Sequence, residues 1–317
     1  MEDRELRVMV LAGGPDRERA VSLTGGEQVS EALQQAGHEV RLRDIMPDQL
    51  DALDEFKQWG GDVLFPVLHG RWGEGGELQR ILSHRDLAYV GSGPAAASLC
   101  INKHLTKLTL EPLGIRTPPA ELLLPGQQRT LKAPVVIKAP EEGSTIGLRI
   151  CHTEDEAQQA YEELSREYPR LMAESYIKGR ELTVGVIEDE SGRPTPLPPI
   201  HIIPAGECYD YDAKYQRDDT QYRFETELPQ SVLDQLAEWS LTAFRVLGIR
   251  HLCRADYLVD EFDRAWFIEV NTMPGFTSHS LLPMAAAEAG LTLSQLADRL
   301  VRRALSDHQP DSMSYTG

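Results

Sequence analysis

Residues 254–280 constrain the fold more than any other segment, because they predict a hairpin with one hydrophilic face. Two β-rich runs, 254–260 and 265–272, are separated by a polar turn around residues 262–263. Strands joined by so short a turn pair antiparallel. The sequence Asn-Thr-Met-Pro-Gly then ends the second strand in a tight loop.

Four polar residues of this hairpin are expected to form one cluster. Side chains alternate between the faces of a strand, so Arg254 shares a face with Asp256 and Glu269 with Asn271. Folding about the turn sets Asp256 opposite Glu269 and Arg254 opposite Asn271. Facing carboxylates repel, and oxygen ligands of this kind indicate Mg²⁺ or Mn²⁺ with substrate phosphates. The alternative is the solvated face of an edge hairpin, which the tight loop disfavours.

The composition predicts several domains and excludes some partners. A chain of 317 residues exceeds the usual single-domain size, so two or three domains are expected. The formal net charge of −18 argues against nucleic acid and anionic membrane surfaces as partners. No apolar run reaches membrane-spanning length, and the four cysteines have no paired spacing. We therefore expect a cytoplasmic protein with reduced thiols.

The first hundred residues predict a parallel α/β domain. Helix-like sequence alternates with three apolar, strand-like runs, at residues 6–12, 38–44 and 63–68. The first helix-like stretch stops at Gly37. Ligands of parallel sheets bind beyond the carboxyl ends of the strands, which is where the sequence has Gly13-Gly14 and His69-Gly70.

Two further units are expected along the chain, and the boundaries are predicted to divide it into 1–102, 103–187 and 188–317. The central unit should be a compact α+β structure of two hairpins around one helix. Its strands and helix are expected at 134–139, 148–152, 171–177, 181–187 and 153–168. The last unit should contain the acidic hairpin, a long polar segment at 206–222 and helices at 231–247 and 293–305.

Two segments of the central unit have features of a nucleotide site. Lys138 precedes the sequence EEGSTIG by two residues. Glycines at both ends of such a loop let backbone N–H groups turn toward phosphate oxygens, although an ordinary hairpin turn fits equally. Glu174 and Glu181 flank an extended segment that suits an adenine edge and a ribose. The alternative is a pair of surface glutamates.

Nine segments of the chain occur in this order in one enzyme family. They are LAGGPDRERAVSL, FPVLHGRWGEGGELQ, YVGSG, INKHLTK, VVIKAPEEGSTIG, MAESYIKGRELTVGV, YDYDAKYQRDDTQY, CRADYLVD and IEVNTMPGFTSHSLLP. Through them the chain resembles the D-alanine–D-alanine ligases of the ATP-grasp superfamily over nearly its whole length. The resemblance implies α/β and α+β architecture, with an ATP-grasp fold behind a Rossmann-like N-terminal domain.

The resemblance also implies a reaction that supplies peptidoglycan synthesis, and with it cell-wall biogenesis and cell shape. ATP would phosphorylate the carboxylate of one D-alanine to an acyl phosphate. The amine of a second D-alanine would attack it through a tetrahedral intermediate, and phosphate would leave. The implied ligands are D-alanine, ATP and two Mg²⁺ or Mn²⁺ ions per site, and a homodimer is common in the family.

Residue by residue, the resemblance implies roles toward the two amino acids. Glu18 would bind the ammonium group of the first D-alanine and connect to Ser144 and Tyr215. His69 and Glu74 would lie near the first substrate, and Ser280 and Leu281 would receive the carboxylate of the second. Arg254 and the backbone of Gly275 would stabilise the oxyanion. The expected catalytic residues are Glu18, Ser144, Tyr215, Arg254, Gly275 and Ser280.

The implied nucleotide and metal roles fall on the central and last units. Phosphates would meet Lys103 and Lys138, with Lys214 closing over the γ-phosphate from a lid at 206–222. Adenine would meet Glu174 and the backbone of Tyr176 and Ile177, and the ribose would meet Glu181. The two metal ions would be held by Asp256, Glu269 and Asn271.

The chain departs from the family pattern at Ala20, Asn102, Ala139, Pro140, Glu141 and Thr145. Ala20 replaces an acidic residue and Asn102 an aspartate, whereas Glu141 stands where a basic residue is frequent. Glu141 adds negative charge near the phosphates, which can weaken ATP binding. The alternatives are a ligase for another D-amino or hydroxy acid and a non-catalytic nucleotide-binding paralogue. Tyr215 indicates an amine as second nucleophile, and retention of Arg254 disfavours the paralogue.

Overall fold

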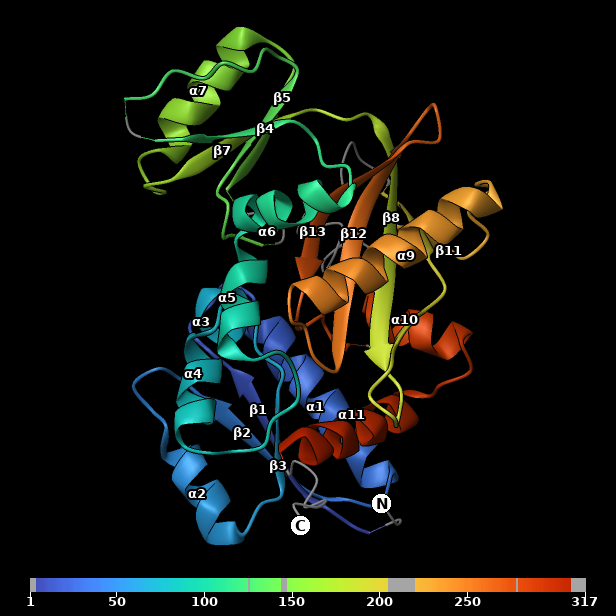
Figure 1. Ribbon diagram of the computed structural model, residues 1–317. Helices are drawn as coiled ribbons and strands as arrows, with labels where there is room; N and C mark the ends of the chain where they lie inside the picture. The colour runs from blue at the N-terminus through green and yellow to red at the C-terminus, as the bar shows by residue number, and fades with distance from the viewer. Residues whose placement is uncertain (1–3, 125, 144–146, 205–219, 278, 309–317) are drawn as a thin grey trace, which may run out of the picture.

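The computed structural model describes residues 4–124, 126–143, 147–204, 220–277 and 279–308. The described chain forms three lobes, each built on its own sheet (Figure 1). A parallel sheet has the order β2-β1-β3, a small sheet has the order β4-β7-β5-β6, and a large sheet has the order β11-β10-β8-β12-β13 with β9 beside β8. Among the described residues, no helix combines the length and the apolar character that crossing a membrane would need.

The N-terminal lobe is the parallel α/β domain that the sequence predicts. Its strands, β1 (Arg7–Gly13), β2 (Glu39–Ile45) and β3 (Val63–Pro66), pair in parallel. The helices around them are α1 (Arg19–Gln35), α2 (Asp51–Trp59), α3 (Gly70–Glu74), α4 (Glu77–His84) and α5 (Pro94–Ile101). Gly37 follows α1 with a positive φ of 87°, as the helix-stop prediction requires.

The small sheet consists of β4 (Ala120–Leu123), β5 (Val135–Lys138), β6 (Leu148–Cys151) and β7 (Leu171–Ser175). Helix α7 (Glu154–Leu164) covers one face of it, where Ala157 and Leu164 pack with Val135 and Ile137. The N-cap Thr153 accepts a hydrogen bond from the Glu156 backbone N–H. The helix ends at Leu164, four residues before the predicted end.

The predicted second hairpin of the central unit is wrong. Strand β8 (Gly179–Glu188) pairs with β10 and β12 of the large sheet, whereas β7 pairs with β4 and β5. Residues 176–178 connect β7 to β8, which belongs to the next sheet. The predicted boundary at 187 and 188 therefore falls inside β8. The three units remain predictions, and we propose residues 176–178 for the second boundary.

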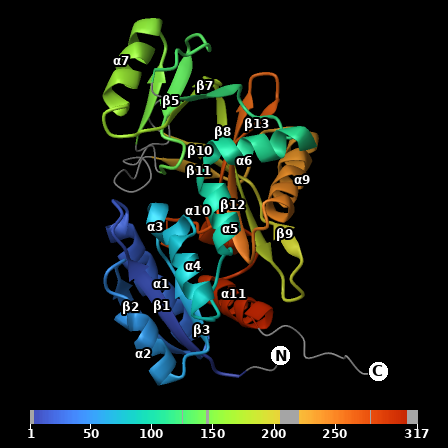
Figure 2. The same cartoon turned by 60° about the vertical axis from the view of Figure 1, so that its left-hand side comes forward.

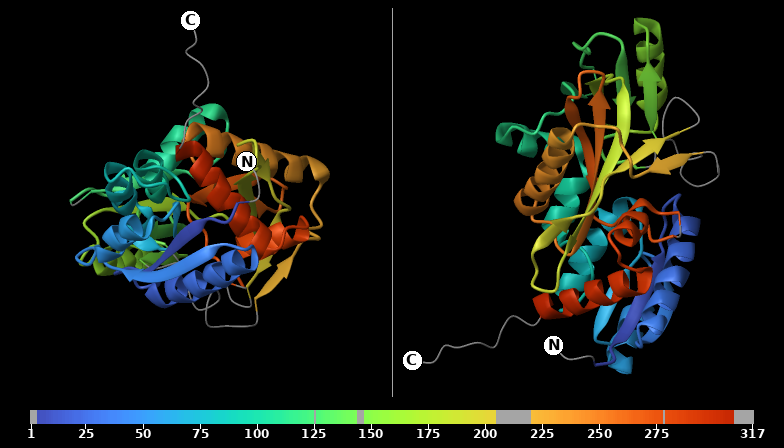
Figure 3. Two further views of the ribbon diagram at one scale, coloured as in Figure 1. Left: turned by 90° about the horizontal axis from the view of Figure 1, so that it is seen from below. Right: turned by 90° about the vertical axis from the view of Figure 1, so that its right-hand side faces the viewer.

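The large sheet contains the predicted hairpin of β12 (Leu252–Asp260) and β13 (Ala265–Asn271). The remaining strands are β8, β9 (Pro194–Pro196), β10 (Ile200–Ile203) and β11 (Gln221–Arg223). Helix α9 (Gln230–Val246) runs along one face, as Figure 3 shows, and part of the other face packs against α10 (Leu281–Glu288). Residues 206–219 of the predicted lid lie outside the described residues, and Gln221 and Tyr222 belong to β11.

Helix α6 (Lys103–Leu110) lies between the small sheet and the large sheet (Figure 2) and continues into a 3₁₀ turn, η1 (Glu111–Leu113). It begins at the N-cap Asn102, whose side chain accepts from the Leu105 backbone N–H. This position lets one helix reach both sheets with its side chains.

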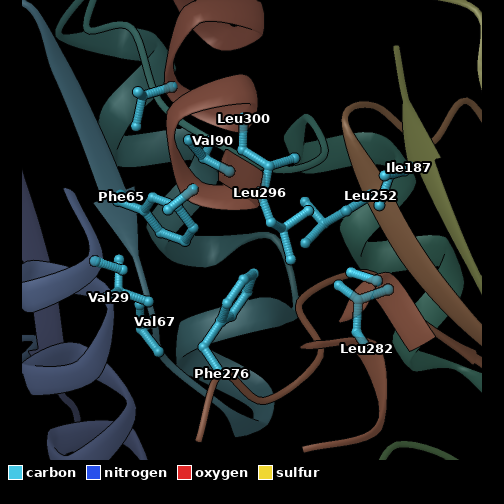
Figure 4. Packing of buried hydrophobic residues seen from close by; sticks show 14 of the residues in the cluster. Val29, Phe65, Val67, Val90, Ile187, Leu252, Phe276, Leu282, Leu296 and Leu300 are labelled. Atoms are coloured by element: carbon cyan, nitrogen blue, oxygen red, sulfur yellow. The ribbon is translucent and has the colours of Figure 1, made fainter. Parts of the chain in front are cut away.

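The last two helices, α10 (Leu281–Glu288) and α11 (Leu293–His308), return to the N-terminal sheet. Figure 4 shows the shared core, in which Phe65 of β3, Phe276, Leu282 and Leu296 pack together. Two buried histidines also fasten α11, because Nε2 of His38 lies 2.8 Å from Asp298 and Nε2 of His251 lies 3.0 Å from Asp307. The lobes are therefore joined at the base and open around α6.

Candidate active site

The acidic hairpin has the predicted pairing at its hydrophilic end. Asp256 stands opposite Glu269, and Arg254 stands opposite Asn271. Toward the turn the register shifts by one, so that Tyr257 pairs with Phe267 and Ile268 is a β-bulge. The sequence did not predict this bulge, which the burial pattern of β13 requires. It changes the alternation along β13, so that Phe267 and Val270 both face the core while Glu269 and Asn271 face the site.

The polar cluster on this hairpin already contains cations from the protein. Arg254 donates to both carboxylate oxygens of Asp256, over 2.9 and 2.8 Å, and the Thr183 hydroxyl donates to the same carboxylate over 2.6 Å. The Lys103 ammonium lies 3.1 Å from Glu269. Thr183 was missed by sequence reasoning, although its place opposite Asp256 in the register would have identified it once the pairing of β8 with β12 was known.

A cavity of about 440 Å³ separates the small sheet from the large sheet. Its walls include the residues predicted to bind a nucleotide, namely Lys103, Lys138, Glu174, Tyr176, Ile177 and Glu181. Asp256 and Glu269 line the same cavity from the hairpin side. The apolar walls are Val136 and Ile150 on one side and Ile202 and Leu258 on the other. A flat ring between two apolar walls, with ammonium and carboxylate groups at one end, is the chemistry of a nucleotide site.

The floor of this nucleotide cavity is a buried ion cluster. The Glu174 carboxylate accepts from the ammonium groups of both Lys107 and Lys138. Burial alone raises the pKa of Glu174, but the two lysine charges outweigh it and leave that pKa lowered. Lys107 had no assigned role from the sequence, because a lysine on a helix is normally exposed.

A second pocket adjoins the nucleotide cavity and shares Lys103, Glu142, Glu269 and Leu281 with it. Glu18, His69 and Glu74 lie together in this pocket, as predicted. The Ser22 hydroxyl accepts from the Gly13 backbone N–H over 2.8 Å and donates to the carbonyl of Val67, which joins the ends of β1 and β3 beneath the loop that carries Glu18.

The charges of this second pocket are unusual for a buried site. Burial and the nearby Glu18 raise the pKa of Glu74 to about 8, and the same two causes raise the pKa of Asp16. Burial lowers the pKa of His69, and its Nε2 atom is buried without a hydrogen-bond partner among the described residues. The pocket therefore has an excess of acidic groups and a neutral imidazole, which suits a cationic ligand group.

The opposite wall of this pocket is the loop that leads into α10. Ser280 and Leu281 lie at the start of this helix, where N–H groups and the helix dipole favour a carboxylate. The Ser280 hydroxyl accepts from the Thr277 backbone N–H over 2.9 Å. A Cβ atom at Gly275 would lie 2.7 Å from that hydroxyl oxygen, so a side chain there would displace Ser280.

Comparison with known proteins identifies the family. The profile of the family described as "D-ala D-ala ligase C-terminus" matches residues 120–302. The D-alanine–D-alanine ligase of Dechloromonas aromatica is 40% identical over 95% of this chain and 98% of its own, and that of Aquifex aeolicus is 36% identical over 93% and 100%. The chain belongs to the D-alanine–D-alanine ligase family.

Solved structures agree with this membership. Two structures of the D-alanine–D-alanine ligase of Bacillus anthracis superimpose on this chain, one of them complexed with ATP, with a TM-score of 0.83, and another with a TM-score of 0.82. Each covers 96% of this chain and 99% of its own. The sequence identity is 28% in the ATP complex. The ATP-grasp fold and the family expected from the sequence are confirmed.

The structure relates two departures from the family pattern, Asn102 and Glu141, because their side chains contact each other. The Asn102 amide donates to the Glu141 carboxylate over 3.0 Å. Arg170 and Arg71 lie 3.5 and 3.9 Å from the same carboxylate. The negative charge that Glu141 adds near the phosphates is therefore shared with two arginines.

Not every predicted site residue can be placed. Ser144, Lys214 and Tyr215 lie outside the described residues, and so does Thr145. The structure brings the other predicted residues together around the two cavities. Lys107 and Thr183, which the sequence did not predict, also contact site residues.

Proposed function

We propose that this protein joins two D-alanines to D-alanyl-D-alanine with hydrolysis of ATP to ADP and phosphate. Membership of the family makes the chain an ATP-dependent carbon–nitrogen ligase of peptidoglycan synthesis. The observation that supports the mechanism is the pair of adjoining cavities, one rich in lysines and one rich in acids, which share Lys103 and Glu269. A phosphoryl group could pass between them at this shared wall.

The first D-alanine would lie in the acidic pocket. Its ammonium group would pair with Glu18, whose charge acts together with burial to raise the pKa of the neighbouring Glu74 and Asp16. Its carboxylate would then point toward Lys103 and the hairpin. The neutral His69 is a donor or acceptor for the substrate rather than a competing cation.

The second D-alanine would lie against the start of α10. The helix dipole and the Ser280 hydroxyl would receive its carboxylate, so that its amine faces the carbonyl of the first substrate. Attack by that amine puts negative charge on the carbonyl oxygen. Arg254 and the Gly275 backbone both line this pocket, and we assign the stabilisation of this oxyanion to them.

The hairpin residues fit a divalent metal. Asp256, Glu269 and Asn271 offer oxygen atoms on one face, and both carboxylates pair with a cationic side chain of the protein. We propose that they bind Mg²⁺ or Mn²⁺, two per site, which would neutralise phosphoryl charge when bound. Lys103 and Lys138 would meet the phosphates, and Lys214 would cover them from the lid.

The deciding experiment measures phosphate release by the purified protein with ATP, Mg²⁺ and D-alanine, together with mass analysis of the product. L-alanine and D-lactate serve as alternative substrates. Formation of D-alanyl-D-alanine from D-alanine alone supports the proposal. Release of phosphate only with D-lactate as second substrate would favour the hydroxy-acid alternative, against which Tyr215 is the sequence argument. A homodimer and a cytoplasmic location stay predictions.

A further inference from the structure

We propose that Lys107 is a positioning residue that frees Lys138 to bind the phosphates of ATP, by acting as the permanent counter-ion of Glu174. This inference rests on the proposed ATP site. Lys107, Glu174 and Lys138 are only 2, 3 and 4% exposed. A charge that is so deeply buried needs a partner at all times.

Lys107 and Lys138 differ in their access to a ligand. Lys138 and Glu174 line the nucleotide cavity, whereas Lys107 lines neither that cavity nor the acidic pocket beside it. Lys107 therefore acts on ATP only through the Glu174 carboxylate. Burial lowers the pKa of Lys107 to about 8, against the attraction of Glu174, so keeping an ammonium group here has a cost.

The charge balance of the cluster explains why a buried ammonium group at Lys107 is useful. Two ammonium groups and one carboxylate leave the cluster with one positive charge. When Lys138 turns to a phosphate, Glu174 keeps Lys107 as its partner. Without Lys107, the remaining pair would be neutral, and Lys138 could reach a phosphate only by leaving a buried carboxylate unpaired.

The position of Lys107 on α6 extends this function to both sheets. Lys103 and Lys107 are one helical turn apart, so they share a face of α6. Lys103 lies 3.1 Å from Glu269 of β13, and Lys107 pairs with Glu174 of β7. One helix thus supplies counter-ions to a carboxylate of each sheet that encloses the nucleotide.

The test compares the binding of ATP with that of adenosine by titration calorimetry, in the full-length protein without D-alanine. Lys107→Met is expected to weaken ATP binding by at least about 30-fold, the low end of what removal of one partner of a buried charge pair costs. Adenosine binding should change by less than about threefold, because Glu174 remains in place. Lys57→Met, which removes an exposed lysine of α2, is the control and should change neither.

A double variant separates this function from a general structural one. Lys107→Met with Glu174→Gln leaves no buried carboxylate to hold Lys138, so the ratio of ATP affinity to adenosine affinity should equal that of Glu174→Gln alone. An equal loss of ATP and adenosine binding in Lys107→Met would overturn the inference. If that single variant does not fold, a lower ratio in the double variant than in Glu174→Gln overturns it instead. Wild-type protein that binds ATP but forms no dipeptide would contradict the proposed function alone.

Discussion

The two cavities of the active site differ in how their buried acidic side chains are compensated. Around the nucleotide cavity, each described acidic group at the centre has a basic partner, as in the pairs Glu174 with Lys138, Glu269 with Lys103 and Asp256 with Arg254. In the neighbouring pocket, burial and mutual repulsion raise the pKa of both Glu74 and Asp16. The acidic groups of one cavity are paired before a ligand arrives, whereas those of the other crowd together and hold their protons more tightly.

This difference matches the charges of the expected ligands. ATP with its metal ions replaces the basic partners by cations of its own, so the acidic groups must be held ready without collapsing together. The first D-alanine instead brings an ammonium group, and a surplus of buried acid is relieved when it binds. Substitutions on the nucleotide side should therefore act mainly on turnover and on ATP, and those on the other side mainly on D-alanine.

The largest effect is expected from Arg254→Ala at the boundary between the two cavities. Loss of an oxyanion donor should lower kcat by about 10²–10³, and it also leaves Asp256 without its bidentate partner. Phosphate release under saturating substrates measures this. Arg264→Ala, which removes an ion pair with Asp260 at the other end of the same hairpin, is the control and should keep kcat within about threefold. Near-normal turnover of Arg254→Ala would refute the oxyanion role.

The next effect concerns Glu18 on the acidic side. Glu18→Gln removes a charged hydrogen-bond acceptor for the ammonium group, which corresponds to about a 10- to 100-fold rise in the KM for D-alanine. The KM for ATP should change by less than about threefold. Steady-state kinetics with each substrate varied in turn measure both. Glu31→Gln, an exposed change on the same helix, is the control, and a larger change in the KM for ATP would contradict the division between the cavities.

Glu74 predicts a pH dependence of stability in the substrate-free protein. Burial and Glu18 raise its pKa from 4.5 to about 8 in the folded state. A raised pKa means that the folded protein binds the proton more tightly, so this contribution to stability is present below pH 4.5 and is lost as the pH rises through 8. The melting temperature should thus fall more between pH 6 and pH 9 in wild type than in Glu74→Gln.

The control for this pH dependence is Glu77→Gln, because Glu77 is an exposed glutamate on the neighbouring helix α4. Its melting curve should follow wild type at each pH. Equal slopes for wild type and Glu74→Gln would show that the Glu74 carboxyl group is ionised in the folded protein. Addition of D-alanine should reduce the difference, since the ammonium group compensates the acidic pocket.

The sequence was sufficient where one local rule determines the structure. Alternation along two strands and the position of a turn predicted that Asp256 faces Glu269, and the structure confirms it. The same rules could not predict the bulge at Ile268, because its cause is the competition between a buried Phe267 and a solvated Glu269. The pairing of β7 with β8 was wrong because strands that follow one another usually pair, whereas here the chain moves to another sheet.

The site was predictable in part. Family resemblance supplied the residues around both cavities, and their individual roles stay predictions. It gave no role to Lys107, since burial of a lysine depends on a carboxylate that is 67 positions away in the chain. It also treated Asn102 and Glu141 as separate departures, although the two side chains share a hydrogen bond.

The smallest effect is expected at this last pair. In Asn102→Asp the new carboxylate retains the N-cap acceptor for the Leu105 backbone N–H, but it faces Glu141 without a proton to donate. We expect the free energy of unfolding to fall by about 1 kcal/mol, which lowers the melting temperature by roughly 2–4 °C. In a Glu141→Gln background the same change should have almost no cost, because an amide can donate to the new carboxylate.

An exposed pair on α7 provides the matched control for this cycle. Gln158 donates to Glu162 over 2.7 Å as Asn102 does to Glu141, but both residues are exposed. Gln158→Glu should therefore lower the melting temperature by no more than about 1–2 °C, since like charges one turn apart on a solvated helix repel by only about 0.2–0.5 kcal/mol. Equal losses in the two pairs would show that Glu141 is solvated and that the two departures from the family pattern are independent.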